Sequence, residues 1–215
     1  MKPSPAASPV IAIDGPAAAG KGTLARRLAA HLNFAYLDTG LLYRAVGTRA
    51  QAEGGDAVQA AAALAPADLD DPTLRLDAAA QLASRVAAVP AVREALLEFQ
   101  RRFAAEPPGG AKGAVLDGRD IGTVVCPHAT LKLFVTASLE ERAARRLKEL
   151  RERGSEAIDS RVLREMRERD ERDCARSVAP LEPAADAVVI DSSGLGPDAV
   201  FAAALAAWRT RQPTD

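Results

Sequence analysis

The chain has 215 residues and a formal net charge of −1, which argues against a nucleic-acid-binding protein that works through a broad basic face. It contains no apolar run of the roughly 20 residues needed to span a bilayer, and its two cysteines are too few for a disulfide framework or a structural zinc site. We therefore expect a cytoplasmic protein that binds neither membrane nor nucleic acid, folds as a single domain over residues 1–215 and stays monomeric.

Residues 1–9 lack the apolar stretch of a secretory signal and are expected to form a frayed end. Beyond them, five short apolar runs are each followed by a polar residue, and we predict a strand for each run. The runs are β-branched without strict alternation, which is typical of strands buried on both faces. Helical patterns separate them, so the sequence predicts a parallel α/β sheet whose polar strand ends gather at one ligand-binding edge. The predicted strands cover residues 10–13, 35–37, 114–116, 131–135 and 188–190.

A glycine-rich segment follows the first strand and precedes a predicted helix over residues 24–32. Its glycines allow a tight turn that aims backbone N–H groups inward, and the helix N-terminus adds positive potential. Such a loop binds the phosphates of a nucleoside triphosphate, with Lys21 at the β and γ phosphates and Thr23 on Mg²⁺. The predicted phosphate loop consists of Gly15, Pro16, Ala17, Ala18, Ala19, Gly20, Lys21, Gly22 and Thr23.

A phosphate loop alone leaves two classes of protein open, a phosphotransferase and a GTPase-like switch that binds nucleotide and signals. The sequence contains no guanine-reading motif of the N-K-x-D kind. A GTPase also has no need for the further arginines described below, which suit a second phosphorylated ligand. The pattern therefore favours a phosphotransferase.

The segment Asp38–Arg44 (DTGLLYR) follows the second strand. A capped helix start explains its first three residues but not Tyr43 and Arg44, which we interpret as ligand-binding residues. Residues from about 54 to 113 then separate the second and third strands and are mostly helical by pattern. Within them Pro90 suits a first helical turn. A stripe of buried residues at helical spacing is predicted behind it, formed by Val92, Leu96, Phe99 and Phe103.

The segment Asp117–Gly122 (DGRDIG) follows the third strand. Asp117 ends an apolar run and is placed like the aspartate that orients hydrated Mg²⁺ in phosphate-loop enzymes. Arg119, at the edge of a crevice, suits a phosphate because guanidinium binds phosphate bidentately. The alternative for this segment alone is a polar turn held by an Asp–Arg pair.

The region from Arg142 to Arg176 holds 11 arginines and Lys148 against nine acidic residues, which by itself predicts solvated helices with paired charges. Ser138 and Glu141 form a capping-box pattern at the start of this region, and Gly154 would end the first helix. After the fifth strand, Gly196-Pro197 opens a last helix. Its predicted buried face consists of Val200, Phe201, Leu205 and Trp208.

Taken together, these segments resemble the bacterial cytidylate kinases, within the nucleoside monophosphate kinases, and the similarity covers almost the whole chain. The resemblance implies transfer of the γ-phosphoryl group of ATP to CMP or dCMP with Mg²⁺. It also implies a three-layer P-loop kinase core, a helical acceptor-binding insert over residues 54–113 and a short lid over 148–160. The segments that carry it are IDGPAAAGKGT (13–23), LDTGLLYRA (37–45), ASRVAAVPAVREALL (83–97), LDGRDIGTVVCP (116–127) and RERDERDCARSVAPLEPAADA (167–187).

The resemblance assigns a role to each matching residue. It makes Lys21, Arg119 and Arg176 catalytic and places Mg²⁺ on Thr23 and Asp117. Cytosine offers an amino donor and two acceptors, which suits reading by a carboxylate together with an arginine. The i, i+4 spacing of Arg169 and Asp173, with Arg176 at i+7, predicts one helix face. The implied acceptor-binding residues are Thr39, Tyr43, Arg44, Arg119 and Arg176 near the phosphate, Ser84, Arg93 and Asp120 at the base, and Arg169 and Asp173 at the sugar.

The chain departs from the family pattern in several places, and two of these departures bear on the predicted site. Ala18 replaces a usual glycine and would be strained if that position needs a positive φ. Between Leu64 and Thr73 the insert is shorter than in the common bacterial form, which has a small antiparallel sheet there. This leaves open the architecture of the acceptor clamp and with it the discrimination between CMP and UMP.

Two alternatives to a CMP kinase stay open. The first is a kinase with another monophosphate acceptor. Adenylate kinases usually carry D-G-[FY]-P-R where this chain has Asp117-Gly118-Arg119-Asp120, which counts against AMP. The second is a nucleotide-binding regulatory protein without transfer activity, against which the arginines for a second phosphate argue.

Overall fold

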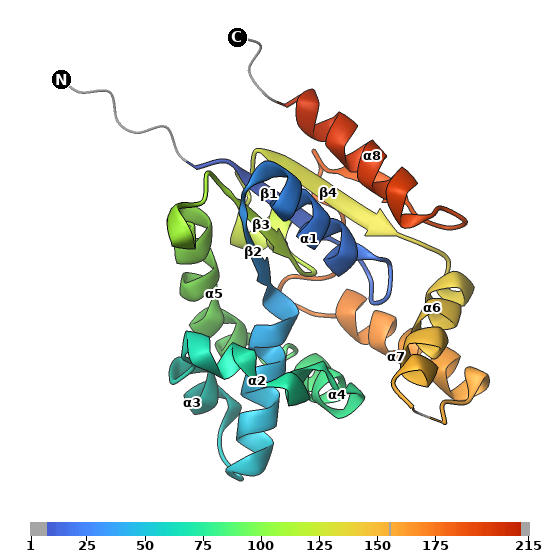
Figure 1. The fold of residues 1–215 in the computed structure, drawn as a ribbon. Coiled ribbons are helices and arrows are strands. Elements are labelled where there is room, and N and C mark those ends of the chain that lie inside the picture. The colour runs from blue at the N-terminus through green and yellow to red at the C-terminus, as the bar shows by residue number, and fades with distance from the viewer. Residues whose placement is uncertain (1–7, 155, 212–215) are drawn as a thin grey trace, which may run out of the picture.

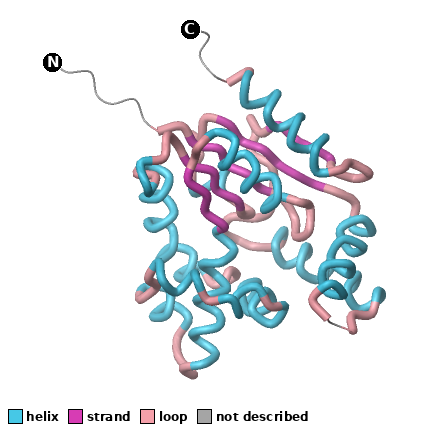
Figure 2. Tube along the Cα trace, in the orientation of Figure 1, coloured by secondary structure: helices cyan, strands magenta, loops and turns pink. Residues whose placement is uncertain are grey.

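The structure, a computed structural model, describes residues 8–154 and 156–211, so most of the predicted frayed end at 1–9 lies outside it. All five predicted strands are present and form one parallel sheet in the order β2-β3-β1-β4-β5 (Figures 1 and 2). Four of the five residues of β1 are buried, as expected of a strand covered on both faces. The strands are β1 (Val10–Asp14), β2 (Ala35–Asp38), β3 (Ala114–Asp117), β4 (Leu131–Thr136) and β5 (Val188–Asp191).

Helices cover both faces of the sheet, which confirms the predicted three layers (Figure 1). Helices α1 (Lys21–Leu32) and α8 (Pro197–Arg209) cover one face, where Ile11 and Ile13 pack into their cluster. Helices α2 (Thr39–Ala52) and α5 (Pro90–Ala105) cover the other face, where Ala12 packs. Within the described ranges, no helix is both long and apolar enough to cross a membrane.

Residues 54–113, all of them described, contain helices and turns and no strand. Besides α5 they form α3 (Ala57–Ala62), α4 (Asp77–Val86) and three short 3₁₀ helices. Two of these, Pro66–Asp70 and Pro72–Arg75, occupy the shortened stretch, and each begins at a proline whose fixed φ suits a first helical position. In the predicted stripe of α5, Val92 and Leu96 are buried while Phe99 and Phe103 pack at the margin of the core.

Helices α6 (Leu139–Glu152) and α7 (Asp159–Cys174) stand beside the sheet and share a small apolar cluster of their own. The predicted capping box is half formed, because the Ser138 hydroxyl accepts from the Glu141 N–H at 3.2 Å but the Ser138 N–H donates to Ser193 Oγ at 2.9 Å. The predicted charge pairing holds at Arg161 and Glu165, 2.7 Å apart. The lid range 148–160 spans the end of α6, the turn at Gly154 and the start of α7, and its Ser155 is outside the described residues.

The prediction that Arg169, Asp173 and Arg176 share one helix face is wrong for Arg176. Helix α7 ends at Cys174, two residues before Arg176. The chain then turns back, and the Leu181 N–H donates to the Asp173 carbonyl oxygen at 3.0 Å. Arg176 still forms an ion pair with Asp173, but it does so from a loop.

Candidate active site

A cavity of about 620 Å³ opens at the carboxyl edge of the sheet and extends between α4 and the α6–α7 pair. Its wall brings together the phosphate loop, the segments after β2 and β3 and the arginines of α7. Of the predicted site residues, Gly15, Pro16 and Asp173 lie outside the lining. The others all line it: Ala17, Ala18, Ala19, Gly20, Lys21, Gly22, Thr23, Thr39, Tyr43, Arg44, Ser84, Arg93, Asp117, Arg119, Asp120, Arg169 and Arg176.

The phosphate loop needs glycine at its first position for a steric reason. Gly15 has φ +140°, and a Cβ there would lie 1.9 Å from the Val135 carbonyl oxygen. Helix α1 begins at Lys21, three residues earlier than predicted, because Gly20 takes the cap position with φ +91°. The Lys21 ammonium donates to the Pro16 carbonyl oxygen at 2.8 Å, so it lies folded back over the loop.

Ala18 has φ +58°, which confirms that this position uses the left-handed region. We expect Ala18→Gly to stabilise the protein by roughly 0.5–1 kcal/mol. The left-handed conformation costs an alanine roughly 1–2 kcal/mol, whereas the greater freedom of glycine in the unfolded chain costs roughly 0.4–1 kcal/mol. Thermal denaturation should therefore show a Tm higher by about 1–4 °C.

Ala19→Gly is the matched control for this prediction. Ala19 is buried in the core and is not among the described residues with positive φ. Its replacement removes a packed methyl group without relieving strain, and it should lower the Tm. An Ala18→Gly variant that melts at or below the parent temperature would contradict the strain argument.

Asp117 and Lys21 lie buried at the base of the cavity and form its charged floor. Burial raises the pKa of Asp117, and Asp38 adds to the shift; burial lowers the pKa of Lys21, to which the nearby Arg119 contributes. The Tyr36 hydroxyl donates to Asp117 Oδ1 at 3.2 Å, while Asp117 Oδ2 faces the loop, 3.4 Å from a Cβ placed on Gly22. The carboxylate is thus oriented toward the loop.

The start of α2 lacks the side-chain cap that a plain capped helix start would have. Asp38 occupies the cap position of α2, but its side chain makes no capping hydrogen bond. The buried Thr39 hydroxyl donates to the Asp117 carbonyl oxygen at 2.7 Å, which ties the start of α2 to the end of β3. The Arg44 guanidinium lies one turn further and donates to the Leu74 carbonyl oxygen at 2.9 Å, across to the insert.

A cluster of arginines faces the phosphate loop across the cavity. Asp173 is buried between Arg119, whose Nε lies 3.0 Å from Asp173 Oδ2, and Arg176. Arg169 lies beside them, and burial together with Arg119 lowers its pKa to about 10. The Nε atoms of Arg169 and Arg176 are buried without a hydrogen-bond partner among the described residues. One carboxylate therefore serves several guanidinium groups, and the cluster suits an additional anion.

The far end of the cavity holds a buried ion pair between Arg93 and Asp120. The Arg93 guanidinium also lies over the Tyr43 ring, 5.6 Å from its centroid, where the π face stabilises the cation. Ser84 is buried in the same wall, and its hydroxyl accepts a long 3.4 Å bond from Arg172. The three residues predicted from separate segments to contact the base, Ser84, Arg93 and Asp120, thus line the same end of the cavity.

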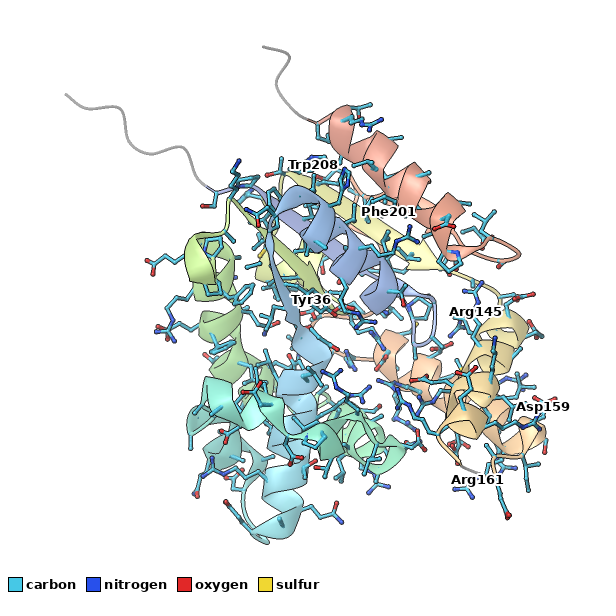
Figure 3. All side chains as sticks on the ribbon, in the orientation of Figure 1. Tyr36, Arg145, Asp159, Arg161, Phe201 and Trp208 are labelled. Carbon is cyan, nitrogen blue, oxygen red and sulfur yellow. The ribbon has the colours of Figure 1, made fainter. Side chains whose placement is uncertain are left out.

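Two arginines of α6, Arg145 and Arg146, line the cavity although the sequence does not single them out. Arg145 donates to the carbonyl oxygen of Ser192 at 2.6 Å and to its hydroxyl at 2.9 Å, and Arg146 pairs with Asp77 of the insert. Arg161, by contrast, does not line the cavity: it lies at the outer end of the α6–α7 pair, where it pairs with Glu165 (Figure 3). In an arginine-rich composition, nothing in the sequence distinguishes these positions from solvated ones.

Comparisons with known proteins agree with this geometry. The sequence model of the family described as Cytidylate kinase matches residues 11–69 and 58–210. A protein named Cytidylate kinase from Paramagnetospirillum magneticum is 67% identical over 204 residues, which cover 92% of this chain and 96% of the relative. Another of that name from Rhodospirillum rubrum is 60% identical over 202 residues, covering 91% and 95%.

Solved structures of lower identity share the fold. A gluconokinase from Sinorhizobium meliloti 1021 superposes with a TM-score of 0.51 at 15% identity, covering 94% of this chain and 93% of its own. An uncharacterized protein from Eubacterium ventriosum reaches a TM-score of 0.57 at 15% identity, covering 94% and 99%. The five-stranded parallel sheet and its covering helices thus have the fold of a P-loop kinase. The family match extends over nearly the whole chain. On these grounds the chain belongs to the cytidylate kinase family.

Proposed function

We propose that this protein transfers the γ-phosphoryl group of ATP to CMP or dCMP, giving ADP and the nucleoside diphosphate. The observation that carries the proposal is the shared cavity, in which a phosphate loop faces the arginine cluster of Arg119, Arg169 and Arg176. One cavity would thus offer the phosphate loop to one phosphorylated ligand and the arginine cluster to a second. The names of the close relatives support the same reaction.

The donor side consists of the phosphate loop and Lys21. Its backbone N–H groups and the start of α1 would bind the β and γ phosphates, with Lys21 turning from the Pro16 carbonyl oxygen toward them. The Thr23 hydroxyl and the Asp117 carboxylate are hard oxygen donors that line the same cavity, and their chemistry fits Mg²⁺. When bound, Mg²⁺ neutralises charge that develops on the phosphate oxygens.

The acceptor side would bind the monophosphate through Arg44, Arg119 and Arg176, and Arg169 would reach the sugar. Asp173 does not line the cavity, so it would act on the acceptor through these arginines and not by contact with the sugar. Asp173 holds the guanidinium groups of Arg119 and Arg176 in place before the ligand arrives. The acceptor phosphate is already ionised, so the reaction needs no strong general base. Catalysis by these residues consists of alignment and charge neutralisation.

The base end supplies the selectivity for cytosine. The Asp120 carboxylate would accept from the cytosine amino group, and Arg93 would donate to the ring acceptors, with Ser84 beside them. Uracil carries a carbonyl oxygen where cytosine carries the amino group. That oxygen would face the carboxylate without a proton between them, which disfavours UMP.

The insert over 54–113 would act as the acceptor clamp and residues 148–160 as the lid. Contacts across the cavity support this division, because Arg146 pairs with Asp77 and Arg153 Nη1 donates to the Arg75 carbonyl oxygen at 2.7 Å. Closure would exclude water that otherwise hydrolyses ATP. We also propose that the enzyme acts as a monomer in the cytoplasm, which its near-neutral charge and few cysteines support.

The test is an ADP-release assay with ATP and Mg²⁺ in which CMP, dCMP, UMP and AMP compete as acceptors. We expect turnover with CMP and dCMP, weaker turnover with UMP and least with AMP. Preferential turnover of UMP or AMP would assign the cavity to another acceptor. ATP binding without turnover of any acceptor would instead support the regulatory alternative.

A further inference from the structure

Asp14 is a buried carboxylate that the sequence analysis noted only as a polar strand end. It is the last residue of β1, directly before Gly15 of the phosphate loop, and it is 4% exposed. Its Oδ1 accepts from the Ile121 N–H and its Oδ2 from the Gly122 N–H, each at 2.7 Å. Asp14 therefore joins the donor loop to the segment that follows β3.

Asp14 does not line the cavity, so its role is not that of a direct ligand. Burial raises its pKa to about 6, against the opposing effect of the two N–H groups. A buried acid is costly unless its hydrogen bonds are satisfied, and here two charge-assisted bonds satisfy it. The contact is also tight, because a Cβ on Gly122 would lie 3.3 Å from Asp14 Oδ2 and 3.2 Å from the Lys132 Cδ.

The two N–H groups belong to the start of a π-helical turn, Ile121–Val125, whose preceding residue is Asp120. Two restraints therefore act on the position of Asp120. Its side chain pairs with Arg93, which stands on α5 of the insert, and its following backbone is held by Asp14, which stands on the central strand. The second restraint fixes the position of Asp120 relative to the sheet, whereas the first fixes it relative to the proposed clamp.

We propose that Asp14 is a positioning residue for acceptor-base selection, acting through the backbone of Ile121 and Gly122 on the carboxylate of Asp120. This inference rests on the proposed function, in which Asp120 reads cytosine. Hydrogen-bonded recognition requires its groups to be held within about 0.5 Å of the productive geometry. A loosened turn would let the carboxylate withdraw from a uracil carbonyl oxygen and would weaken its bond to the cytosine amino group.

The test compares Asp14→Asn with the parent enzyme by kcat/KM for CMP and for UMP and by KM for ATP. Asparagine has the shape of aspartate but presents an NH₂ group to one of the two N–H donors, so one bond is lost. We expect the CMP-over-UMP ratio of kcat/KM to fall about tenfold, with a smaller change in KM for ATP. Equal losses for CMP and UMP, or a change confined to ATP, would overturn the proposal.

Two further variants separate positioning from general destabilisation. In an Asp120→Asn background, Asp14→Asn should change the ratio by less than about twofold, because residues that act as a unit are non-additive. Trp208→Leu disturbs buried packing against Phe34, at the amino ends of the strands, and should leave the ratio unchanged (Figure 3). A full additional loss in the Asp120→Asn background would show that Asp14 acts independently of Asp120.

The outcomes for Asp14 are distinguishable from those for the proposed function. A parent enzyme without preference for CMP would contradict the proposed function itself. A parent with that preference and an Asp14→Asn variant that retains it would contradict only the role of Asp14. If Asp14→Asn does not yield folded protein, Asp14→Ser, which keeps one acceptor in a smaller side chain, is measured in the same way and judged by the same ratio.

Discussion

Arg119→Ala should lower kcat by roughly 10³-fold or more, as expected when an arginine that stabilises charge in phosphoryl transfer is removed. Arg119 lies where the two ligands would meet, close enough to Lys21 to lower the pKa of that lysine and bonded to Asp173 on its other side. Its loss removes a positive charge from beside the transferring group and leaves the Asp173 carboxylate with Arg176 as its ion-pair partner. Steady-state ADP release with saturating ATP and CMP measures the effect.

Arg119→Lys and Arg27→Ala are the controls for this result. Lysine retains the charge but not the planar fork, so the Arg119→Lys variant should fall between the parent and Arg119→Ala. Arg27 of α1 forms an exposed ion pair with Asp198 of α8 and does not line the cavity. The Arg27→Ala variant should therefore turn over at the parent rate. A folded Arg119→Ala variant with a kcat within tenfold of the parent would contradict the role given to this residue.

Lys21→Ala should lower kcat by roughly 10²–10³-fold and leave the protein folded. Burial lowers the pKa of Lys21, which means that its charge is unfavourable in the folded protein without a bound anion. Removing it therefore costs little in stability, whereas the bound γ phosphate would lose the ammonium group that neutralises its charge. Turnover and thermal denaturation, measured on the same preparation, separate the two effects.

Lys112→Ala is the matched lysine control. Lys112 is exposed and precedes β3 at the opposite edge of the sheet, where its N–H donates to the Asn33 carbonyl oxygen. Its replacement should change neither kcat nor the Tm. Turnover of Lys21→Ala near the parent rate would mean that the loop binds ATP without using this ammonium group in the transfer.

The fold was predictable because its strands are apolar on both faces and end abruptly. Val10–Ile13 and Ala114–Leu116 show this directly, and the structure confirms both. The order of the strands was not predictable from these runs, because any of them could pair with any other by pattern. The helix over Leu24–Leu32 was predicted too short, since Lys21, Gly22 and Thr23 of the predicted phosphate loop already form its first turn.

The candidate site was predictable where a polar residue ends a strand, as at Asp117, and where a glycine-rich segment leads from a strand into a helix, as at Lys21. The family resemblance was needed for Arg93 and Asp120, which lie 27 residues apart and meet only in the folded chain. Arg145 and Arg146 were missed because nothing in a sequence with 23 arginines distinguishes the few that line the cavity. Asp14 was undervalued because its partners are backbone N–H groups, which carry no side-chain signal.

The strand order also dictates the sequence of events in folding. Both neighbours of β1 come from the second half of the chain, β3 beginning at Ala114 and β4 ending at Thr136. A growing chain that has not yet reached Ala114 thus holds β1 with both edges unpaired, and β2 waits for the same partner. Because such distant pairings close slowly and exposed strand edges aggregate, β1 gains its neighbours late in folding. An amino-terminal fragment that ends before Ala114 leaves β1 and β2 unpaired and prone to aggregation.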